Sequence, residues 1–474
     1  MKTHFLKLTY LIIIFLSSLS TFSQIELTNK VLDFGTLLPV ESANIYIKGT
    51  TIGTISNVDG KFLLIVPKQH EKDTLVISSI GFKSFKTPVN AFDNAVDIYL
   101  EEDIASLDEI LLVAEPRPTT GNEIVLKAIE KLQFNLPDSA YIQKGFLRHK
   151  ERNKLEFKWL IESAITVYDS GFASNSTDYL KINVDQVRKS YDLRDVDSVF
   201  SYIAYSNRNV KPSLKIKDVD RSSLNTNQLI KAIKWNDTRV NGLQNLFQGK
   251  LNLLRNANNT KALFGENVLQ NHQFKLDTIL VDNERKIYKV KISESKDFVG
   301  LDTKGIYNEG YVANGWLYIY YDNYAIKKIE YELVAASPEQ KIRSKSLFDT
   351  QINHKLVMTF MEYEDKMYPN YIYYETPKLV NVGLKTKEKI SKEEEERYNK
   401  EQRFYYTVQE ILFTEVILDK EKINEKLNSK WDPDIFATKP YNKSFWKNYN
   451  VLLESEEDEK LIQDLTKRAK LYKD

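Results

Sequence analysis

The chain has 474 residues, 67 Lys and Arg against 66 Asp and Glu, a net charge of +1, and no cysteine. The balanced charge gives no support to a nucleic-acid partner, because chains that bind nucleic acids are generally basic. The lack of cysteine excludes disulfides, a thiolate nucleophile and cysteine-ligated metals. A chain of this length can bury about three quarters of its unfolded surface, so we expect its core alone to stabilise it.

Residues 1–23 have the pattern of a secretory signal peptide. Two lysines precede an apolar core over 8–16, and small residues stand at the −3 and −1 positions of a cleavage site between Ser23 and Gln24. The alternative is an uncleaved anchor, but a membrane span needs about 20 apolar residues and this core is much shorter. The sequence therefore predicts an exported protein of the periplasm, the outer membrane or the cell surface.

Residues 24–113 contain short strands separated by turns. An Asp-Gly pair at Asp59-Gly60 precedes an apolar run, which is typical of a hairpin whose turn requires positive φ. Polar and apolar side chains alternate in the first strand, as expected when one face is buried. Strands are expected over 44–49, 62–66, 75–80 and 96–100. Short strands at this spacing predict a small β-sandwich.

These motifs, in this order, resemble the carboxypeptidase-like regulatory domain, a transthyretin-like β-sandwich of exported Bacteroidetes proteins. The resemblance covers about one small domain. In that family the module is an accessory of uptake receptors or catalytic domains, so the resemblance implies a first domain without an active site. The matching motifs are Ala43-Asn44-Ile45, Lys48-Gly49-Thr50, Gly53-Thr54, Asp59-Gly60-Lys61-Phe62 and Ile77-Ser78-Ser79-Ile80-Gly81-Phe82.

Residues 114–121 hold two prolines and a glycine, a composition typical of a linker. Asn122 is expected to cap a helix whose apolar residues extend to Leu132. This region resembles the one that follows the regulatory domain in other Bacteroidetes proteins, and that resemblance implies no activity. Two further helices are expected over 227–235 and 240–254.

Long antiparallel strands are predicted for most of the remaining chain. They are expected over 141–147 and 155–168, then in the pairs 274–281 with 286–292, 315–321 with 325–333 and 354–363 with 368–374, and finally over 403–418. The predicted fold class is mostly β, with an N-terminal transthyretin-like β-sandwich followed by a larger α+β domain, residues 122–474, built on an extended, curved antiparallel sheet.

Two charged segments follow or interrupt these strands. The run 392–397 is expected to be a solvated loop or helical turn, with a docking site for a basic partner as the alternative. Residues 454–471 predict a charged helix with one apolar side, which we expect to pack on the sheet.

The sequence predicts no catalytic, cofactor-binding or metal site, and no cofactor. The histidines after the signal peptide are His70, His149, His272 and His354, and none has the spacing of a zinc peptidase. The glycine-rich nucleotide motifs and the serine-hydrolase motif are also missing. Glu151 would share a strand face with His149, but a lone histidine among charges is expected at the surface, with a metal site as the minor alternative.

Aromatic residues gather over 316–321 and 371–374, on both faces of their strands. Cross-strand packing is the preferred interpretation, and a wide apolar cavity or a sugar- or lipid-contacting face is the alternative. We predict a non-enzymatic binding or structural module of the cell envelope, whose partner is an envelope protein or an apolar or glycan ligand. The alternatives are a periplasmic carrier of lipid or lipoprotein, and a hydrolase that uses carboxylates. No transmembrane helix is expected in the mature chain.

Cleavage after Ser23 should leave Gln24 as the N-terminus of the mature protein. Mass spectrometry of the protein from the envelope fraction is expected to find that terminus, in open or cyclised form. An intact Met1 on a membrane-embedded form would contradict the prediction.

Overall fold

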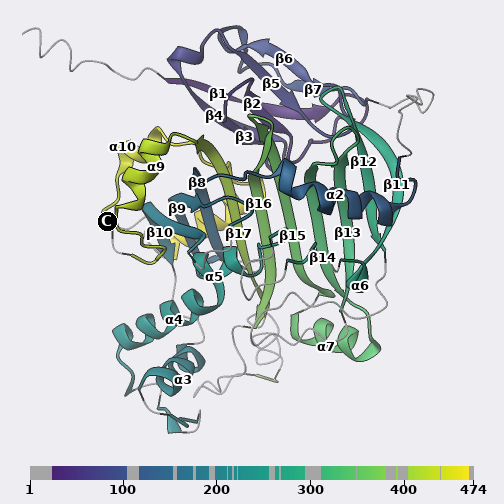
Figure 1. The fold of residues 1–474 in the computed structure, drawn as a ribbon. Helices are drawn as coiled ribbons and strands as arrows, with labels where there is room; N and C mark the ends of the chain where they lie inside the picture. The colour runs from purple at the N-terminus through teal and green to yellow at the C-terminus, as the bar shows by residue number, and fades with distance from the viewer. Residues whose placement is uncertain are drawn as a thin grey trace, which may run out of the picture.

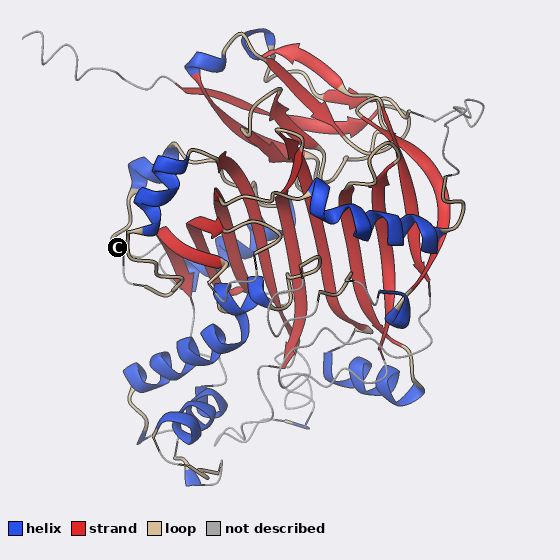
Figure 2. Cartoon of the chain, in the orientation of Figure 1, coloured by secondary structure: helices blue, strands red, loops and turns tan. Residues whose placement is uncertain are grey.

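The computed structural model describes residues 24–103, 117–152, 157–174, 178–191, 198–210, 212–215, 218–220, 223–255, 262–265, 268–293, 311–348, 350–379, 391–392, 404–437 and 439–468 (Figure 1). The predicted signal peptide and nearly all of the charged run at 392–397 lie outside these residues. The described chain forms a small two-sheet domain followed by one large antiparallel sheet with helices on its faces and ends (Figure 2).

The first domain is the predicted β-sandwich. One sheet has the strand order β4-β1-β7 and the other β3-β2-β5-β6. Ile45 and Ile47 of β2 are fully buried between the sheets while their neighbours are half-exposed, as the alternation predicted. The elements are β1 (Gln24–Asp33), β2 (Asn44–Ile47), β3 (Gly53–Ile55), β4 (Lys61–Pro67), β5 (Thr74–Ser78), β6 (Phe85–Pro88) and β7 (Ile98–Leu100), with 3-10 turns at Lys68–His70 and Val89–Ala91.

The Asp59-Gly60 turn does not form the predicted hairpin. Its flanking strands β3 and β4 belong to opposite sheets, so the turn carries the chain across the sandwich. Gly60 has the expected positive φ of 77°, but Asp59 is not among the positive-φ residues, so the turn lacks the two such residues of a type I′ hairpin. The crossing is held because Val31 N donates to Gly60 O at 2.8 Å.

Ten strands make the large sheet, in the order β10-β9-β8-β17-β16-β15-β14-β13-β12-β11, with every neighbouring pair antiparallel. The predicted hairpins are present. The strands are β8 (Tyr141–Arg152), β9 (Phe157–Asp169), β10 (Leu180–Tyr191), β11 (Gln273–Asp282), β12 (Arg285–Ser293), β13 (Tyr311–Tyr320), β14 (Ile326–Ala335), β15 (Ile352–Tyr363), β16 (Lys366–Leu379) and β17 (Phe404–Ile417).

The helices are α2 (Gly121–Asn135), α3 (Ser198–Asn209), α4 (Thr226–Asn241), α5 (Leu243–Gln248), α6 (Val268–Asn271), α7 (Pro338–Phe348), α9 (Lys420–Leu427), α10 (Lys443–Lys447) and α11 (Glu456–Arg468). The cap of α2 is Thr120, in a capping box with Glu123, and the prediction of Asn122 was wrong. The Asn122 side chain instead accepts from Phe274 N at 2.8 Å. The helix predicted over 240–254 is only α5, because Gly242 and Gly249 flank it.

Both faces of the large sheet are covered. We call inner the face on which α2 and α5 pack, and α2 crosses it at the front of Figure 1. On the opposite, outer face, Phe146 and Leu412 pack against Trp446 of α10, and Leu160 packs against Leu465 of α11. The predicted packing of the C-terminal helix on the sheet is therefore confirmed. None of the described helices is long and apolar enough to cross a membrane.

The first domain lies over one end of the large sheet (Figure 1). Gly81 N donates to Val281 O at 2.7 Å, and Lys86 pairs with Glu284 at 2.6 Å in the β11–β12 turn. Further along the sheet, Val416 N donates to Thr51 Oγ1 at 3.2 Å. Contacts to β11 and β17 span much of the width of the sheet and hold the first domain in place.

Gly60→Ala should destabilise the first domain more than Gly49→Ala. Both glycines have φ near +77°, but a Cβ at Gly60 would lie 2.4 Å from Val31 O, whereas one at Gly49 would have nothing within 4 Å. We expect a loss of about 1–2 kcal/mol at Gly49 from the conformation alone, and about 1–3 kcal/mol more at Gly60 from the clash. Hydrogen exchange of peptides from β1 and β4 measures both, and equal losses would contradict the prediction.

Candidate functional site

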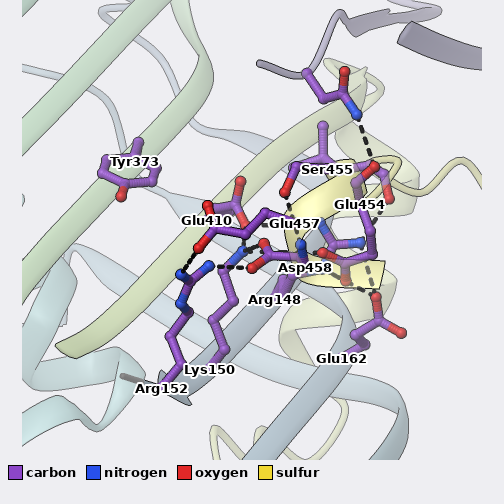
Figure 3. Close-up of polar contacts among 12 residues, drawn as sticks. Arg148, Lys150, Arg152, Glu162, Tyr373, Glu410, Glu454, Ser455, Glu457 and Asp458 are labelled. Carbon is purple, nitrogen blue, oxygen red and sulfur yellow. Dashed lines mark hydrogen bonds and ion pairs between the residues drawn. The ribbon is translucent and has the colours of Figure 1, made fainter. Parts of the chain in front are cut away.

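A row of alternating charges crosses the outer face of the large sheet. From β10 to β16, the residues directly opposite one another are Arg188, Glu162, Arg148, Glu410 and Tyr373. Arg148 lies 3.1 Å from Glu162 and 3.6 Å from Glu410 (Figure 3). Arg188 pairs with Glu162 at 2.6 Å. Because opposite charges on neighbouring strands attract, the row favours this register of the sheet.

The C-terminal segment closes over this charged row. Glu454 lies 2.8 Å from Arg148, and Asp458 in the first turn of α11 lies 2.6 Å from Lys150 (Figure 3). Leu452 O accepts a hydrogen bond from Arg148 at 2.6 Å. Arg148 and Glu162 are almost fully buried, so removal of either one would change the balance of charges in the interior and should be destabilising.

The cluster holds one more carboxylate than cation among the described residues. Its cations are Arg148, Lys150, Arg152 and Arg188, and its carboxylates are Glu162, Glu410, Glu454, Glu457 and Asp458. Burial raises the pKa of Glu454 to about 7, partly offset by Arg148 and Lys150. Burial also opposes ionisation of Glu410, but Lys150 and Arg148 outweigh it and lower its pKa. Glu454 is therefore the carboxyl group that holds a proton near neutral pH.

The same segment binds the first domain. Asp59 Oδ2 accepts from Glu456 N at 2.7 Å, Lys61 pairs with Glu456 at 3.0 Å, and Asn57 Nδ2 donates to Glu454 O at 2.8 Å. The crossing turn of the β-sandwich thus contacts the N-terminus of α11, whose dipole favours a carboxylate there. Residues 454–458 join the first domain to the charged row.

The inner face carries a second row of polar residues, which lies beneath α4 and α5. His149, Gln409 and Tyr374 lie opposite one another on β8, β17 and β16, and each is fully buried. His149 Nε2 lies 3.2 Å from Asp237 of α4. Glu151 shares the face with His149, as predicted, but the expectation that His149 is at the surface was wrong. β8 is a central strand with both faces covered, so alternation directs every second residue into the core.

Lys250 extends this inner cluster from the loop after α5. Its ammonium lies 5.1 Å from the centre of the Tyr374 ring, and burial, partly offset by Asp237, lowers its pKa to about 8. His354 Nδ1 lies 2.9 Å from Tyr374 Oη, and burial together with the Lys250 charge lowers the pKa of His354 to about 3. His354 is therefore a neutral imidazole at physiological pH. Lys250 does not line the cavity described next.

A cavity of about 120 Å³ opens on the inner face between the sheet, the end of α2, α5 and the loop that follows α5. Its walls are mainly apolar. The residues that line it are Leu136, Pro137, Tyr141, Asp169, Phe172, Tyr179, Leu180, Phe247, Leu251, Asn252, Leu253, Leu254, Arg255, Met358, Phe360, Met367, Pro369 and Ile372. An apolar pocket with a few converging polar groups is the usual form of a small-molecule site.

An ion pair forms the polar part of the cavity wall. Arg255 Nη2 lies 2.7 Å from Asp169 Oδ1, and the guanidinium lies 4.7 Å from the centre of the Tyr179 ring. Burial raises the pKa of Asp169 despite the opposing charge of Arg255, and burial beside Asp169 raises that of Tyr141. No motif in the sequence marks these residues, because they come from the ends of β8 and β9 and from loops far apart in the chain. The aromatic clusters over 316–321 and 371–374, at which a cavity was the alternative interpretation, contribute only Ile372 to its lining.

The other predicted positions lie apart. Gln24 is the first residue of β1, and Ser23 lies outside the described residues. His70 contacts Asp73 at 2.7 Å on the first domain, and buried His272 lies 3.1 Å from Tyr331 Oη. In the part of the chain that the structure describes, no three His, Asp or Glu side chains lie together so as to hold a metal ion.

The first domain matches a known family. Residues 28–112 match the model of the CarboxypepD_reg-like domain. This part of the chain is a carboxypeptidase-like regulatory domain. TonB-dependent receptor SusC of Bacteroides thetaiotaomicron is 34% identical over 96 residues, which are 19% of this chain and 9% of that receptor. A TonB-dependent receptor of Formosa agariphila is 31% identical over 77 residues, 16% of this chain and 7% of the receptor. The chain thus spans less than a tenth of either relative.

Two solved structures align with a larger part of the chain. A LolA superfamily protein from Nitrosomonas europaea has 10% identity, a TM-score of 0.22 and coverage of 66% of this chain and 99% of that one. A DUF1329 family protein from Desulfovibrio piger has 8% identity, the same TM-score of 0.22 and coverage of 63% and 93%. A TM-score this low does not establish a shared fold.

Glu454→Gln should gain stability relative to the wild type as the pH rises from 5 to 8. The pKa of Glu454 rises from its ordinary 4.5 to about 7 on folding, so the wild type loses stability through this window because only its unfolded state releases the proton freely. We expect the difference in unfolding free energy to change by on the order of 1–3 kcal/mol. Thermal unfolding of both proteins across this range measures it.

Glu456→Gln is the matched control. The Lys61 hydrogen bond lowers the pKa of Glu456, which is exposed, so both of its states titrate below the window. Its difference from the wild type should stay constant from pH 5 to 8. A constant difference for Glu454→Gln as well would show that Glu454 is ionised throughout.

Proposed function

We propose that the protein is an exported, non-enzymatic binding module of the cell envelope, in which the large sheet holds a small apolar ligand and the first domain is an accessory. The observation that carries the proposal is the cavity of about 120 Å³ on the inner face, with largely apolar walls and a single ion pair. The match of the first domain to TonB-dependent receptors supports an envelope location.

Two alternatives are less well supported. A carrier of a lipid or lipoprotein chain is favoured by the same cavity and by apolar packing on both faces of the sheet. However, an apolar cavity of about 150 Å³ admits one benzene, so a cavity of about 120 Å³ suits a hydrocarbon group no larger than benzene rather than a whole lipid chain. A carboxylate hydrolase would need an open acidic cleft, whereas the acidic cluster on the outer face is buried and paired with cations.

Methionine methyl signals can test the proposal, because two of the four methionines line the cavity. Met358 and Met367 do so, and Met361 does not. In the mature chain carrying ¹³C-methyl methionine, benzene should shift the signals of Met358 and Met367 in a saturable way and leave Met361 unchanged. Leu254→Phe should abolish the shifts by filling the cavity.

Ile342→Phe is the control for Leu254→Phe, because Ile342 is 71% exposed on α7 and does not line the cavity. It should leave the benzene shifts as in the wild type. Unchanged methionine signals at saturating benzene would contradict a ligand site in this cavity. Release of pentanoate from methyl pentanoate by the purified protein, with Leu254→Phe inactive, would contradict the non-enzymatic assignment.

A further inference from the structure

Two hydrogen-bond donors in the cavity wall have no partner among the described residues. They are Asn252 Nδ2 and Arg255 Nη1, and both atoms are buried. The two residues belong to one turn, in which Arg255 N donates to Asn252 Oδ1 at 3.3 Å. A buried N–H group without an acceptor is unfavourable, so a ligand that brings an acceptor into the cavity would gain free energy from both donors.

The charge of Arg255 is already balanced. Nη2 pairs with Asp169 at 2.7 Å, and the ring of Tyr179 lies against the guanidinium. A second carboxylate at Nη1 would lie near Asp169, and two carboxylates that share one cation repel each other. A neutral carbonyl oxygen accepts the same hydrogen bonds without adding charge, so it matches the site better than an anion does.

The rest of the cavity wall favours the hydrocarbon part of a ligand. Phe247, Met358, Phe360 and Ile372 surround the space, and none of them offers a conventional hydrogen-bond donor or acceptor on its side chain. A ligand must therefore combine a hydrocarbon part no larger than benzene with one polar end placed at the turn of Asn252 and Arg255.

We propose that this cavity binds a small uncharged ester or amide whose carbonyl oxygen accepts hydrogen bonds from Arg255 Nη1 and Asn252 Nδ2 while its hydrocarbon part lies among the apolar wall residues. The proposal rests on the function proposed above and assigns its ligand class. Asp169 is then a positioning residue, because it holds the guanidinium so that Nη1 is left for the ligand.

Four probes separate the chemistries: methyl pentanoate, N-methylpentanamide, the pentanoate anion at pH 8, and benzene. Each is titrated into the mature chain with ¹³C-methyl methionine, and the shifts of Met358 and Met367 report occupancy. The ester or the amide should bind at least tenfold more tightly than pentanoate, and comparison of the two identifies the preferred carbonyl. Tighter binding of pentanoate would overturn the proposal.

Arg255→Met should weaken binding of the carbonyl probes about tenfold and leave benzene binding intact. Arg285→Met is the matched control, because Arg285 likewise pairs with a carboxylate, Asp322 at 2.8 Å, and lies 3.8 Å over Tyr320, but does not line the cavity. Arg285→Met should change neither the binding of the carbonyl probes nor the binding of benzene. If Arg255→Met does not fold, Asn252→Ala provides the same comparison with a smaller change.

The two proposals fail in different ways. If benzene and the carbonyl probes all leave Met358 and Met367 unshifted, the cavity is not a ligand site and both proposals are overturned. If benzene binds but Arg255→Met and Asn252→Ala leave carbonyl binding unchanged, the two donors do not bind the carbonyl oxygen. Only this inference is then overturned.

Discussion

The alternating charges on the outer face of the sheet are the constraint on which the rest of the structure depends. Arg148 lies between Glu162 and Glu410 in exact cross-strand register and is almost fully buried. A slip of one residue would turn this guanidinium to the inner face, away from these carboxylates. The attraction between the charges and the cost of unpairing them thus specify one register for β8, the strand that lies between β9 and β17.

The charged row also explains how the chain ends and how its two parts are joined. The row needs more carboxylates than the strands supply, and the C-terminal segment provides them through Glu454 and Asp458. The same segment then reaches Asp59 and Lys61 in the crossing turn of the first domain. The carboxypeptidase-like regulatory domain is therefore coupled to the sheet by hydrogen bonds and ion pairs.

The inner face of the same strands has one polar region and one apolar region. Near α4, buried polar residues such as His149 and Lys250 occupy the space under the helices. Toward the end of α2, apolar side chains leave a cavity whose only ion pair joins Arg255 to Asp169. Because the helices close one part of this face and leave another open, a sheet that is apolar on both sides can still offer a ligand site.

The sequence by itself determined the elements that depend on local patterns. Period-2 alternation and turn residues predicted the hairpins of the large sheet and the sandwich strands, and the apolar stripe of α11 predicted its packing. Prediction from the sequence failed where a residue contacts others that are far away along the chain. Asp59-Gly60 resembled a hairpin but crosses between two sheets, and His149 beside charges resembled a surface residue but lies in a central strand. The charged row and the contact of the Asn252–Arg255 turn with Asp169 of β9 were decided only by the tertiary structure, because strand order, burial and contacts between distant segments leave no trace in residue spacing.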